Sequence, residues 1–436
     1  MNGYGLRTPS GWWECTLKDV CNGNGGVIQT GPFGSQLHAH DYKETGTPVV
    51  MPQQLGDNHI SIDGIARVSD EDVQRLKRHC LRRGDIVFSR RGDVTRRAFI
   101  TERENGWLCG TGCMLIRPHH PKLSNEYLAF FFSLREVKDY ITKQAVGATM
   151  PNLNTGILEA IPLFLPSLTY QQKAVSILTA YDDLIENNTR RIAILEEMAQ
   201  AIYREWFVHF RFPGHEQVRL VDSPLGKIPE GWRHALLSDV ADVNALSVKN
   251  GKEPDEIHYV DIASVSTGSI DEVRLLPFSE APGRARRIVR HGDLIWSTVR
   301  PNRKSYSLIV NPLPNTIVST GFAVISGTKA PFSYLFHALT TDDFVGHLVN
   351  HATGSAYPAV NASDFEKATI LVPADNVLAA FQKITEPMFL ARHCFAERNG
   401  RLRACRDLLL PKLISGQLDV EDLDIDPGKP LDAVAP

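Results

Sequence analysis

The sequence predicts an α+β protein in which two copies of one domain are separated by long helices. Three observations lead to this prediction. A series of short motifs occurs twice along the 436-residue chain, in the same order each time. The segments around these motifs are short, apolar and rich in β-branched residues, which is typical of strands. One further segment keeps its apolar residues at alternating steps of three and four, which is typical of a helix packed along another helix.

The repeated motifs divide the chain into two domains, predicted at residues 1–168 and 213–374. Most matched motifs are separated by a similar distance, and their order is never broken, so chance does not explain them. They are Gly11-Trp12 with Gly231-Trp232, residues 84–89 with 292–297, Thr111-Gly112 with Thr320-Gly321, Tyr127-Leu128 with Tyr334-Leu335, and Gly147, Pro151 and Asn154 with Gly354, Pro358 and Asn361.

Each domain is predicted to contain a mixed or antiparallel sheet with a few helices. Residues 85–89 form a short apolar run bounded by glycine and arginine, and residues 293–297 are its counterpart. Both runs favour strands. Residues 125–144 and their counterparts, 332–351, are the longest predicted helices inside the domains.

The segment 169–212 is predicted to be one long helix. At ~1.5 Å per residue such a helix spans roughly 55 Å, which is longer than a small domain is wide, so it must pack lengthwise against a partner. Asn188 is the one polar residue in its apolar seam, and a polar seam residue fixes register at a cost in stability. The other seam residues are Leu178, Tyr181, Ile185, Ile192, Leu195, Ala199, Ile202 and Trp206.

A second long helix is predicted at residues 375–416. Its seam includes Phe395, Leu402 and Leu409, but Pro387 and Gly400 fall inside it. Because proline removes an internal hydrogen bond, we expect this helix to kink or restart at Pro387. The remaining residues, 417–436, form an acidic tail that we expect to be frayed.

Composition and charge exclude several classes of protein. The formal net charge of −3 argues against coating of nucleic acid by bulk charge. Seven scattered cysteines, an odd number, do not indicate a disulfide framework. The chain has neither an apolar run long enough to span a membrane nor a signal-like N-terminus, so we expect a cytoplasmic protein.

No catalytic or metal-binding constellation stands out. The chain lacks a Gly-Lys-Ser/Thr phosphate loop and an Asn/Asp-Pro-Pro-aromatic methyltransferase motif. Pro254-Asp255 is followed by Glu272-Val273-Arg274, with arginine where a nuclease needs lysine. Neither the histidines near Asp41 nor His119 and His120 have the spacing of a metal site. We therefore predict a non-catalytic chain with no metal site.

Two arginine-rich loops lie at equivalent places in the repeats and are the candidate DNA-binding elements. Arginine can contact guanine through two parallel hydrogen bonds or clamp a phosphate. The alternative interpretation of each loop is a solvated turn between strands. The same two interpretations apply to the loops 147–152 and 354–359. The candidate residues are Arg90, Arg91, Arg96, Arg97, Thr149, Asn152, Arg300, Asn302, Arg303 and Lys304.

The long helices carry motifs that resemble those of a known family. The first helix contains Gln171-Gln172-Lys173, Tyr181-Asp182-Asp183, Ile185-Glu186-Asn187-Asn188, residues 195–201 and Trp206-Phe207-Val208. These are similar to the central conserved region of Type I restriction-modification specificity (S) subunits. Residues 408–416 resemble the distal conserved region of that family. The resemblance extends over essentially the whole chain.

The resemblance implies two target-recognition domains, separated by long conserved helices that form an antiparallel coiled coil. Each domain would read one half of a bipartite site on double-stranded DNA. The helices would set the gap and dock two methyltransferase (M) subunits, with restriction/translocase (R) subunits in the restriction form. S-adenosylmethionine, ATP and Mg would be held by those partners and no cofactor by this chain. The docking residues would be Leu178, Tyr181, Ile185, Asn188, Ile192, Leu195, Ile202, Trp206, Phe395, Leu402 and Leu409.

Two alternatives remain open at this point. The chain could be a fragment or homologue of a single-chain restriction-methylation enzyme, although it lacks the motifs of the catalytic parts. It could also be a helical scaffold that assembles proteins without reading DNA. DNA binding with sequence preference would separate the second alternative from a specificity subunit.

Overall fold

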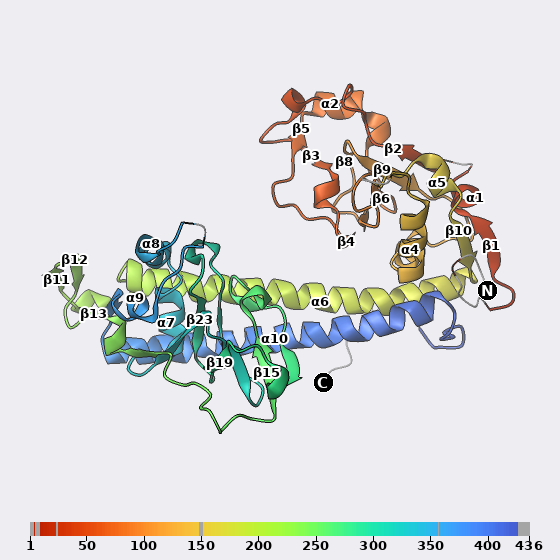
Figure 1. The fold of residues 1–436 in the computed structure, drawn as a ribbon. Coiled ribbons are helices and arrows are strands. Elements are labelled where there is room, and N and C mark those ends of the chain that lie inside the picture. Colours follow the sequence, from red (N-terminus) through yellow and green to blue (C-terminus); the bar gives the residue numbers. More distant parts are fainter. Residues whose placement is uncertain (1–3, 5–8, 23–24, 148–150, 356, 426–436) are drawn as a thin grey trace. The chain divides into compact units, whose positions relative to one another are not determined.

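The computed structural model divides the chain into two compact units, each of which holds one repeated domain. Unit 1 comprises Met1–Glu186 and Gly400–Pro436, and unit 2 comprises Asn187–Asn399. The boundary therefore falls inside both long helices, α6 (Leu168–Tyr203) and α10 (Asp375–Ile414) (Figure 1). The residues described by the structure are residue 4 and residues 9–22, 25–147, 151–355 and 357–425.

The domain of unit 1 is built on a five-stranded mixed sheet in the order β2-β9-β6-β7-β4. All neighbouring strands are antiparallel except β4 and β7, which are parallel. All four residues of the central strand β6 are buried, as expected for a strand covered on both faces. The strands are β2 (Val27–Thr30), β9 (Cys113–Arg117), β6 (Ile86–Ser89), β7 (Arg97–Phe99) and β4 (Asp57–Asn58).

Smaller sheets and short helices complete this domain. A three-stranded sheet has the order β5-β3-β8, and β1 pairs with β10. Helix α1 begins after Thr16, whose backbone N–H donates to the Asp19 carboxylate (2.7 Å) in a capping box. The elements are β1 (Trp13–Thr16), α1 (Leu17–Cys21), β3 (Thr47–Val50), β5 (Arg67–Val68), α2 (Asp70–Arg75), β8 (Leu108–Cys109), α3 (Asn125–Phe131), α4 (Arg135–Gln144), α5 (Thr155–Glu159) and β10 (Pro162–Leu165).

The domain of unit 2 repeats this architecture. Its first sheet has the order β14-β23-β20-β21 and its second the order β18-β15-β22-β19, in which β15 and β22 are parallel. The sheets contain β14 (Ala241–Val243), β15 (Glu256–Val260), β18 (Arg274–Pro277), β19 (Ala285–Ile288), β20 (Leu294–Ser297), β21 (Tyr306–Leu308), β22 (Thr316–Ser319) and β23 (Phe322–Gly327).

Three strand pairs and three helices complete unit 2. The hairpin of β11 and β12 precedes the repeated domain in the chain, and β13 pairs with β24 as β1 pairs with β10 in unit 1. The elements are β11 (Leu220–Ser223), β12 (Gly226–Pro229), β13 (Arg233–Leu236), β16 (Val265–Ser266), β17 (Ser269–Ile270), α7 (Phe332–Ala338), α8 (Asp342–His351), α9 (Ala362–Glu366) and β24 (Thr369–Val372).

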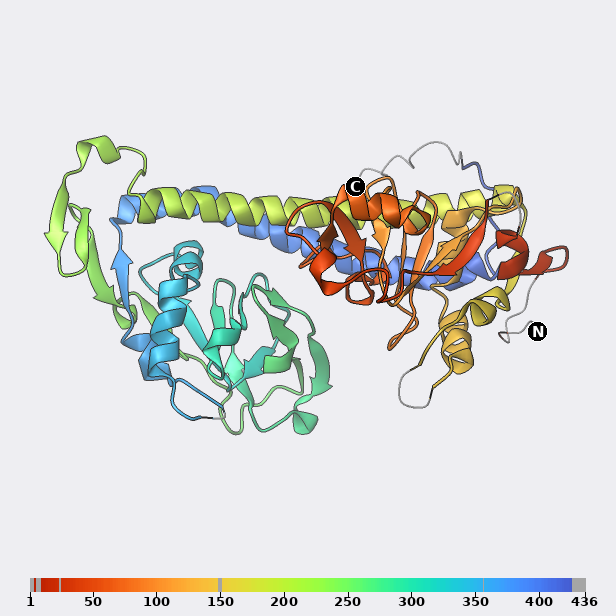
Figure 2. The same ribbon diagram turned by 90° about the horizontal axis from the view of Figure 1, so that it is seen from above.

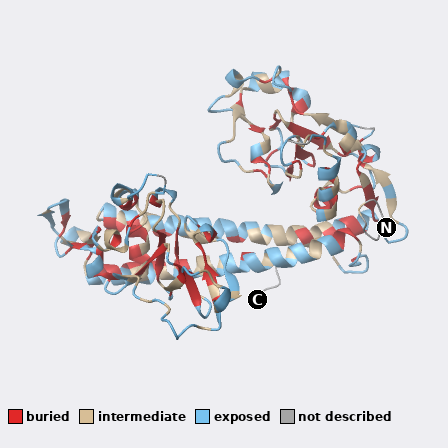
Figure 3. Cartoon of the chain, in the orientation of Figure 1, coloured by how far each residue is buried: buried red, intermediate tan, exposed pale blue. Residues whose placement is uncertain are grey.

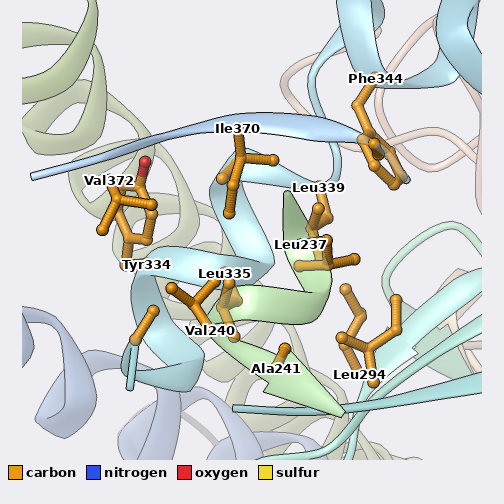
Figure 4. Packing of buried hydrophobic residues seen from close by; sticks show 14 of the residues in the cluster. Leu237, Val240, Ala241, Leu294, Tyr334, Leu335, Leu339, Phe344, Ile370 and Val372 are labelled. Carbon is orange, nitrogen blue, oxygen red and sulfur yellow. The ribbon is translucent and has the colours of Figure 1, made fainter. Parts of the chain in front are cut away.

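The main core of unit 2 lies between its first sheet and the helices α7 and α8. Figure 4 shows Leu294 of β20 and Ala241 of β14 in the same cluster as Tyr334 and Leu335 of α7 and Phe344 of α8. Buried residues are concentrated inside the domains, whereas much of the surface of α6 and α10 is exposed or half-buried (Figure 3). The predicted α+β class is confirmed, because two domains of like sheet order alternate with two long helices.

Helices α6 and α10 lie side by side within each unit (Figures 1 and 2). In unit 1 the Tyr170 hydroxyl donates to the Leu413 carbonyl (2.8 Å), and Asp182 pairs with Arg406 (2.6 Å). In unit 2 the buried Asn188 donates to the Asn399 side chain (2.9 Å), and Glu196 pairs with Arg392 (2.5 Å). In both units, a residue that lies further along α6 pairs with a residue that lies nearer the start of α10. The two helices are therefore antiparallel within each unit.

Of the predicted kink or restart of the second helix at Pro387, the restart is wrong. Helix α10 runs as one element of 40 residues through Pro387 and Gly400. Pro387 has no N–H, so the carbonyl of Lys383 lacks its helical hydrogen-bond donor. Both residues are exposed, so water can hydrate that carbonyl. On the opposite side Phe381 and Phe389 are buried and hold the helix against the domain of unit 2. Tertiary packing therefore outweighs the local cost of proline.

The pairing of Asn188 with Asn399 generates a stability prediction. Asn188→Ala removes the donor to the Asn399 oxygen inside a buried seam, and we expect a loss of about 1–3 kcal/mol in the free energy of unfolding. The double variant Asn188→Leu/Asn399→Leu should lose less than this single variant, because it leaves no amide buried. Urea unfolding of the full chain measures both.

The exposed neighbour Asn187 provides the control. Asn187→Ala should change the free energy of unfolding by no more than about 0.5 kcal/mol. Asn188→Leu and Asn399→Leu complete the cycle. If the double variant loses as much stability as these two single variants added together, the paired amides do not act as a unit.

Candidate nucleic-acid interface

The loop that follows β6 carries the first group of predicted arginines. The Ser89 N–H donates to the Arg96 carbonyl (2.9 Å) and closes the loop, while the Ser89 hydroxyl donates to the Arg91 carbonyl (2.9 Å). Gly92 has a φ of 74°, a conformation that favours glycine. Arg91 is exposed, and Arg90 and Arg96 are half-buried. The loop is thus a defined turn that presents Arg91 to solvent.

A second loop, between α4 and α5, packs against the first. Val146 and Asn152 exchange two backbone hydrogen bonds (3.1 and 3.0 Å), and the Leu153 N–H donates to the Arg90 carbonyl (2.9 Å). The structure therefore brings Arg90, Arg91 and Asn152, three of the candidate residues, together. Thr149 lies outside the described residues.

The loop after β20 occupies the equivalent place in unit 2. The Val360 N–H donates to the Thr298 carbonyl (2.9 Å), and the Arg300 N–H donates to the Pro358 carbonyl (2.7 Å). The Ser297 hydroxyl donates to the Val299 carbonyl (3.0 Å), as that of Ser89 donates to Arg91. The two repeats therefore hold these loops in one common frame of backbone hydrogen bonds.

The side chains in this common frame differ between the repeats. Arg300 stands where unit 1 has Gly92, and its φ of 51° is in the same left-handed region. Its guanidinium carbon lies 4.6 Å from the ring centre of Tyr357, a side chain that is 70% exposed. Lys304 forms an ion pair with Asp342 (2.7 Å), whereas Asn302 and Arg303 are exposed.

Tyr357, among the described residues of this surface, is absent from the candidates that the sequence indicated. Its loop, 354–359, is a candidate by its position in the repeat. The sequence does not show that the tyrosine lies beside Arg300, so it does not distinguish Tyr357 from its neighbours. An exposed aromatic ring beside an arginine is a surface on which a base or a sugar can stack. The geometry adds Tyr357 to the candidate interface.

Arg97, in contrast, is not available for DNA binding. Its side chain is 0% exposed and its guanidinium pairs with Asp57 (2.9 Å) and donates to the Ser133 hydroxyl (2.5 Å). Burial opposes ionisation of Asp57, but Arg97 and Lys138 outweigh it and hold the pKa of this carboxyl below its ordinary value. Arg97 of β7 therefore connects β4 with the turn between α3 and α4, and we remove it from the candidate interface.

A further group of arginines in unit 2 lies on and next to β19, and most of its members contact neighbouring groups. Arg284 contacts the carboxylate of Asp261, and the guanidinium of Arg286 lies 5.1 Å from the ring centre of Phe278. Arg287 donates to the Ser247 hydroxyl (3.2 Å). These contacts give the group a structural role along β19 and its surroundings.

The predicted docking residues are buried to different degrees. Leu178 and Asn188 are buried, and Trp206 belongs to the core of unit 2, in the π-helical segment Arg204–Val208 that follows α6. The others are half-buried: Tyr181, Ile185, Ile192, Leu195, Ile202, Phe395, Leu402 and Leu409.

Neither metal clusters nor membrane spans are found in the part of the chain that the structure describes. Among the described residues, no group of three or more histidine, cysteine, aspartate or glutamate side chains could hold a metal ion. Within that part of the chain, none of the helices combines the length and the apolar character needed to cross a membrane.

Comparison with known proteins gives consistent matches. A family model described as the type I restriction modification DNA specificity domain matches residues 9–197. The MjaIX type I specificity subunit of Methanocaldococcus jannaschii is 24% identical, and the alignment covers 96% of each chain. The HindI specificity subunit of Haemophilus influenzae is 25% identical over 81% of this chain and 90% of its own. The S subunit from M. genitalium has the same fold, with a TM-score of 0.60 and 12% identity over 95% of this chain and 97% of its own.

The ion pair of Arg97 and Asp57 generates a prediction about stability. Asp57→Ala leaves the buried guanidinium without its carboxylate, and we expect a loss of about 3 kcal/mol in the free energy of unfolding. Adding Arg97→Met should recover most of this loss, because the double variant no longer buries a charge. Thermal and urea unfolding of the full chain measure the effect.

Arg91→Ala is the matched control for an arginine at the surface. It should change the free energy of unfolding by no more than about 0.5 kcal/mol. If Asp57→Ala were as harmless as Arg91→Ala, the buried pair would not support the fold as we infer.

Proposed function

The chain belongs to the family of type I restriction-modification specificity subunits, and on this premise we propose that each repeated domain reads one half of a bipartite site on double-stranded DNA. The observation that carries the proposal is the common frame that holds the arginine-bearing loops in both repeats. One backbone scaffold, used twice with different side chains, suits a protein that reads two different short sequences.

The side chains of each loop match the chemistry of DNA. Arg91 in unit 1 and Arg303 in unit 2 are exposed, and their guanidinium groups can pair with phosphate or with the edge of guanine. Tyr357 with Arg300 offers a stacking surface that unit 1 does not share among its described residues. We propose that phosphate contacts position each domain and that a minority of these side chains contact bases.

We propose that α6 and α10 set the gap between the two half-sites and dock two methyltransferase subunits. Both helices contain residues of unit 1 and of unit 2, which supports a role as spacer. Exposed apolar side chains on α6, such as Ile194 and Met198, are available to a partner. Restriction/translocase subunits would join in the restriction form of the complex.

The chain itself would be non-catalytic in this proposal. S-adenosylmethionine would bind the methyltransferase partners, and ATP and Mg would bind the restriction partners. The role of this chain would be to select the DNA sequence on which those subunits act.

A map of N6-methyladenine in cells that express this chain with its methyltransferase tests the function. A split motif of two short blocks with a fixed gap is the expected result. Methylation at a continuous motif would contradict the division of the site between the two domains. Methylation without sequence preference would favour the helical scaffold.

The exposed Arg91 and the half-buried Arg96 of the unit 1 loop give a sharper prediction. Arg91→Ala/Arg96→Ala should weaken binding of the complex to its DNA site by roughly 10-fold or more. For each arginine that no longer neutralises a phosphate, the slope of log binding constant against log salt concentration should decrease in magnitude by ~0.9. The effect should depend on the sequence of one half-site only. Fluorescence anisotropy across a salt series measures both quantities.

Arg82→Ala/Arg83→Ala is the matched control, because these exposed arginines precede β6 whereas the loop follows it. This variant should bind DNA like the parent chain. Equal decreases in affinity for the two pairs would mean that general positive charge, and not the loop, accounts for the binding.

A further inference from the structure

The loops 298–304 and 354–359 of unit 2, here called the paired loops, form a short two-stranded ribbon. Val299 and Ala359 form an antiparallel bridge, between the backbone hydrogen bonds that join the two loops. Thr353 and Ala359 exchange two further backbone bonds (2.9 Å each), which close the second loop on itself. Main-chain groups therefore hold the ribbon in place, whatever side chains it carries.

Tyr357 projects from the paired loops beside Arg300. It is 70% exposed, although the guanidinium carbon of Arg300 lies 4.6 Å from its ring centre. A cation at this distance is attracted to the ring, so Arg300 restrains the ring while most of its surface stays open. The φ of Arg300 is 51°, a conformation that costs free energy in a residue with a side chain, and Gly92 of unit 1 avoids this cost at the equivalent place. The arginine in unit 2 therefore indicates a role for its side chain.

The width of the paired loops favours the major groove of DNA. Backbone segments joined by hydrogen bonds lie ~4.8 Å apart. With side chains on both segments, such a ribbon is wider than the roughly 6 Å of the minor groove, whereas the major groove, about 12 Å wide, admits a two-stranded ribbon. We therefore expect Tyr357 to meet the edges of the bases from the major groove.

The chemistry of these edges identifies what an aromatic ring can contact. The face of a paired base is covered by its neighbours in the stack, and extruding a base costs free energy. On the major-groove edges of the four bases, the apolar group is the C5-methyl of thymine. Packing of this methyl group on an aromatic ring removes apolar surface of both from water.

We propose that Tyr357 recognises the C5-methyl group of a thymine in the half-site that unit 2 reads, while Arg300 restrains the ring. The proposal rests on the function proposed above and adds to it the base, and the chemical group on that base, that one residue selects. Tyr357 is then a specificity-determining residue of unit 2.

Duplexes that carry deoxyuridine in place of thymine test the proposal, because this replacement removes only the C5-methyl group. Each thymine of the two half-sites, on either strand, is replaced in turn. Fluorescence anisotropy measures binding of the full chain in complex with its methyltransferase. At one thymine of one half-site, the replacement should weaken binding of the parent complex roughly fourfold, the value of one buried methyl group. In Tyr357→Ala the same replacement should have no effect.

Two variants serve as controls. Tyr357→Phe keeps the aromatic ring and should keep the fourfold difference between thymine and deoxyuridine. Phe33→Ala removes an exposed aromatic side chain from unit 1 and should also keep the difference at that thymine. The comparison is a thermodynamic cycle between one side chain and one methyl group, so changes that affect DNA binding in general cancel.

The proposal is overturned if no replacement weakens binding of the parent complex, or if every replacement affects the parent and Tyr357→Ala equally. Failure of the proposed function has a different signature. In that case the parent complex would bind the split site no more tightly than a duplex with scrambled half-sites. A clear preference for the split site without a thymine that depends on Tyr357 would overturn this inference alone.

Discussion

The structure of each unit depends on the register between α6 and α10. An apolar seam alone would tolerate a shift of one helical turn, because Leu, Ile and Phe side chains can replace one another in such contacts. A shift would, however, separate Asn188 from Asn399 and bury both amides without each other. Asp182 with Arg406 in unit 1 and Glu196 with Arg392 in unit 2 form only in the same register. The polar groups therefore select one of several alignments that the apolar residues would allow.

In the two repeats the backbone of the arginine-bearing loops is held in the same way, whereas the side chains on it differ. Backbone hydrogen bonds between Ser89 and Arg96, and between Ser297 and Ser305, close the two loops in the same way. The bonds involve main-chain groups, so the side chains in between are free to differ. Arg300 takes the place of Gly92 at the cost of a left-handed backbone conformation. The same frame can in this way present different chemical groups to a ligand.

Much of this architecture could be predicted from the sequence, because repetition and periodicity are local signals. The strands around Val87 and Ile295, the seam position of Asn188 and the equivalence of the arginine loops all follow from motif order and spacing. The continuity of α10 could not be predicted, since the local cost of Pro387 is offset by packing of Phe381 and Phe389 against a domain. The burial of Arg97 depends on Asp57, which lies far away in the sequence, and no local pattern reveals such a pairing.

The division of the chain also bears on the order in which the protein acquires its structure during synthesis. Unit 2 is one uninterrupted stretch, whereas the core of unit 1 includes Leu413, Ile414 and Val420 from the far end of the chain. A ribosome therefore releases all of unit 2 before it releases the last residues that unit 1 needs. The domain of unit 1 is therefore synthesised first but completed last. Until then, its apolar residues that contact the end of α10 stay exposed. A chaperone that shields this surface would act on the nascent first domain.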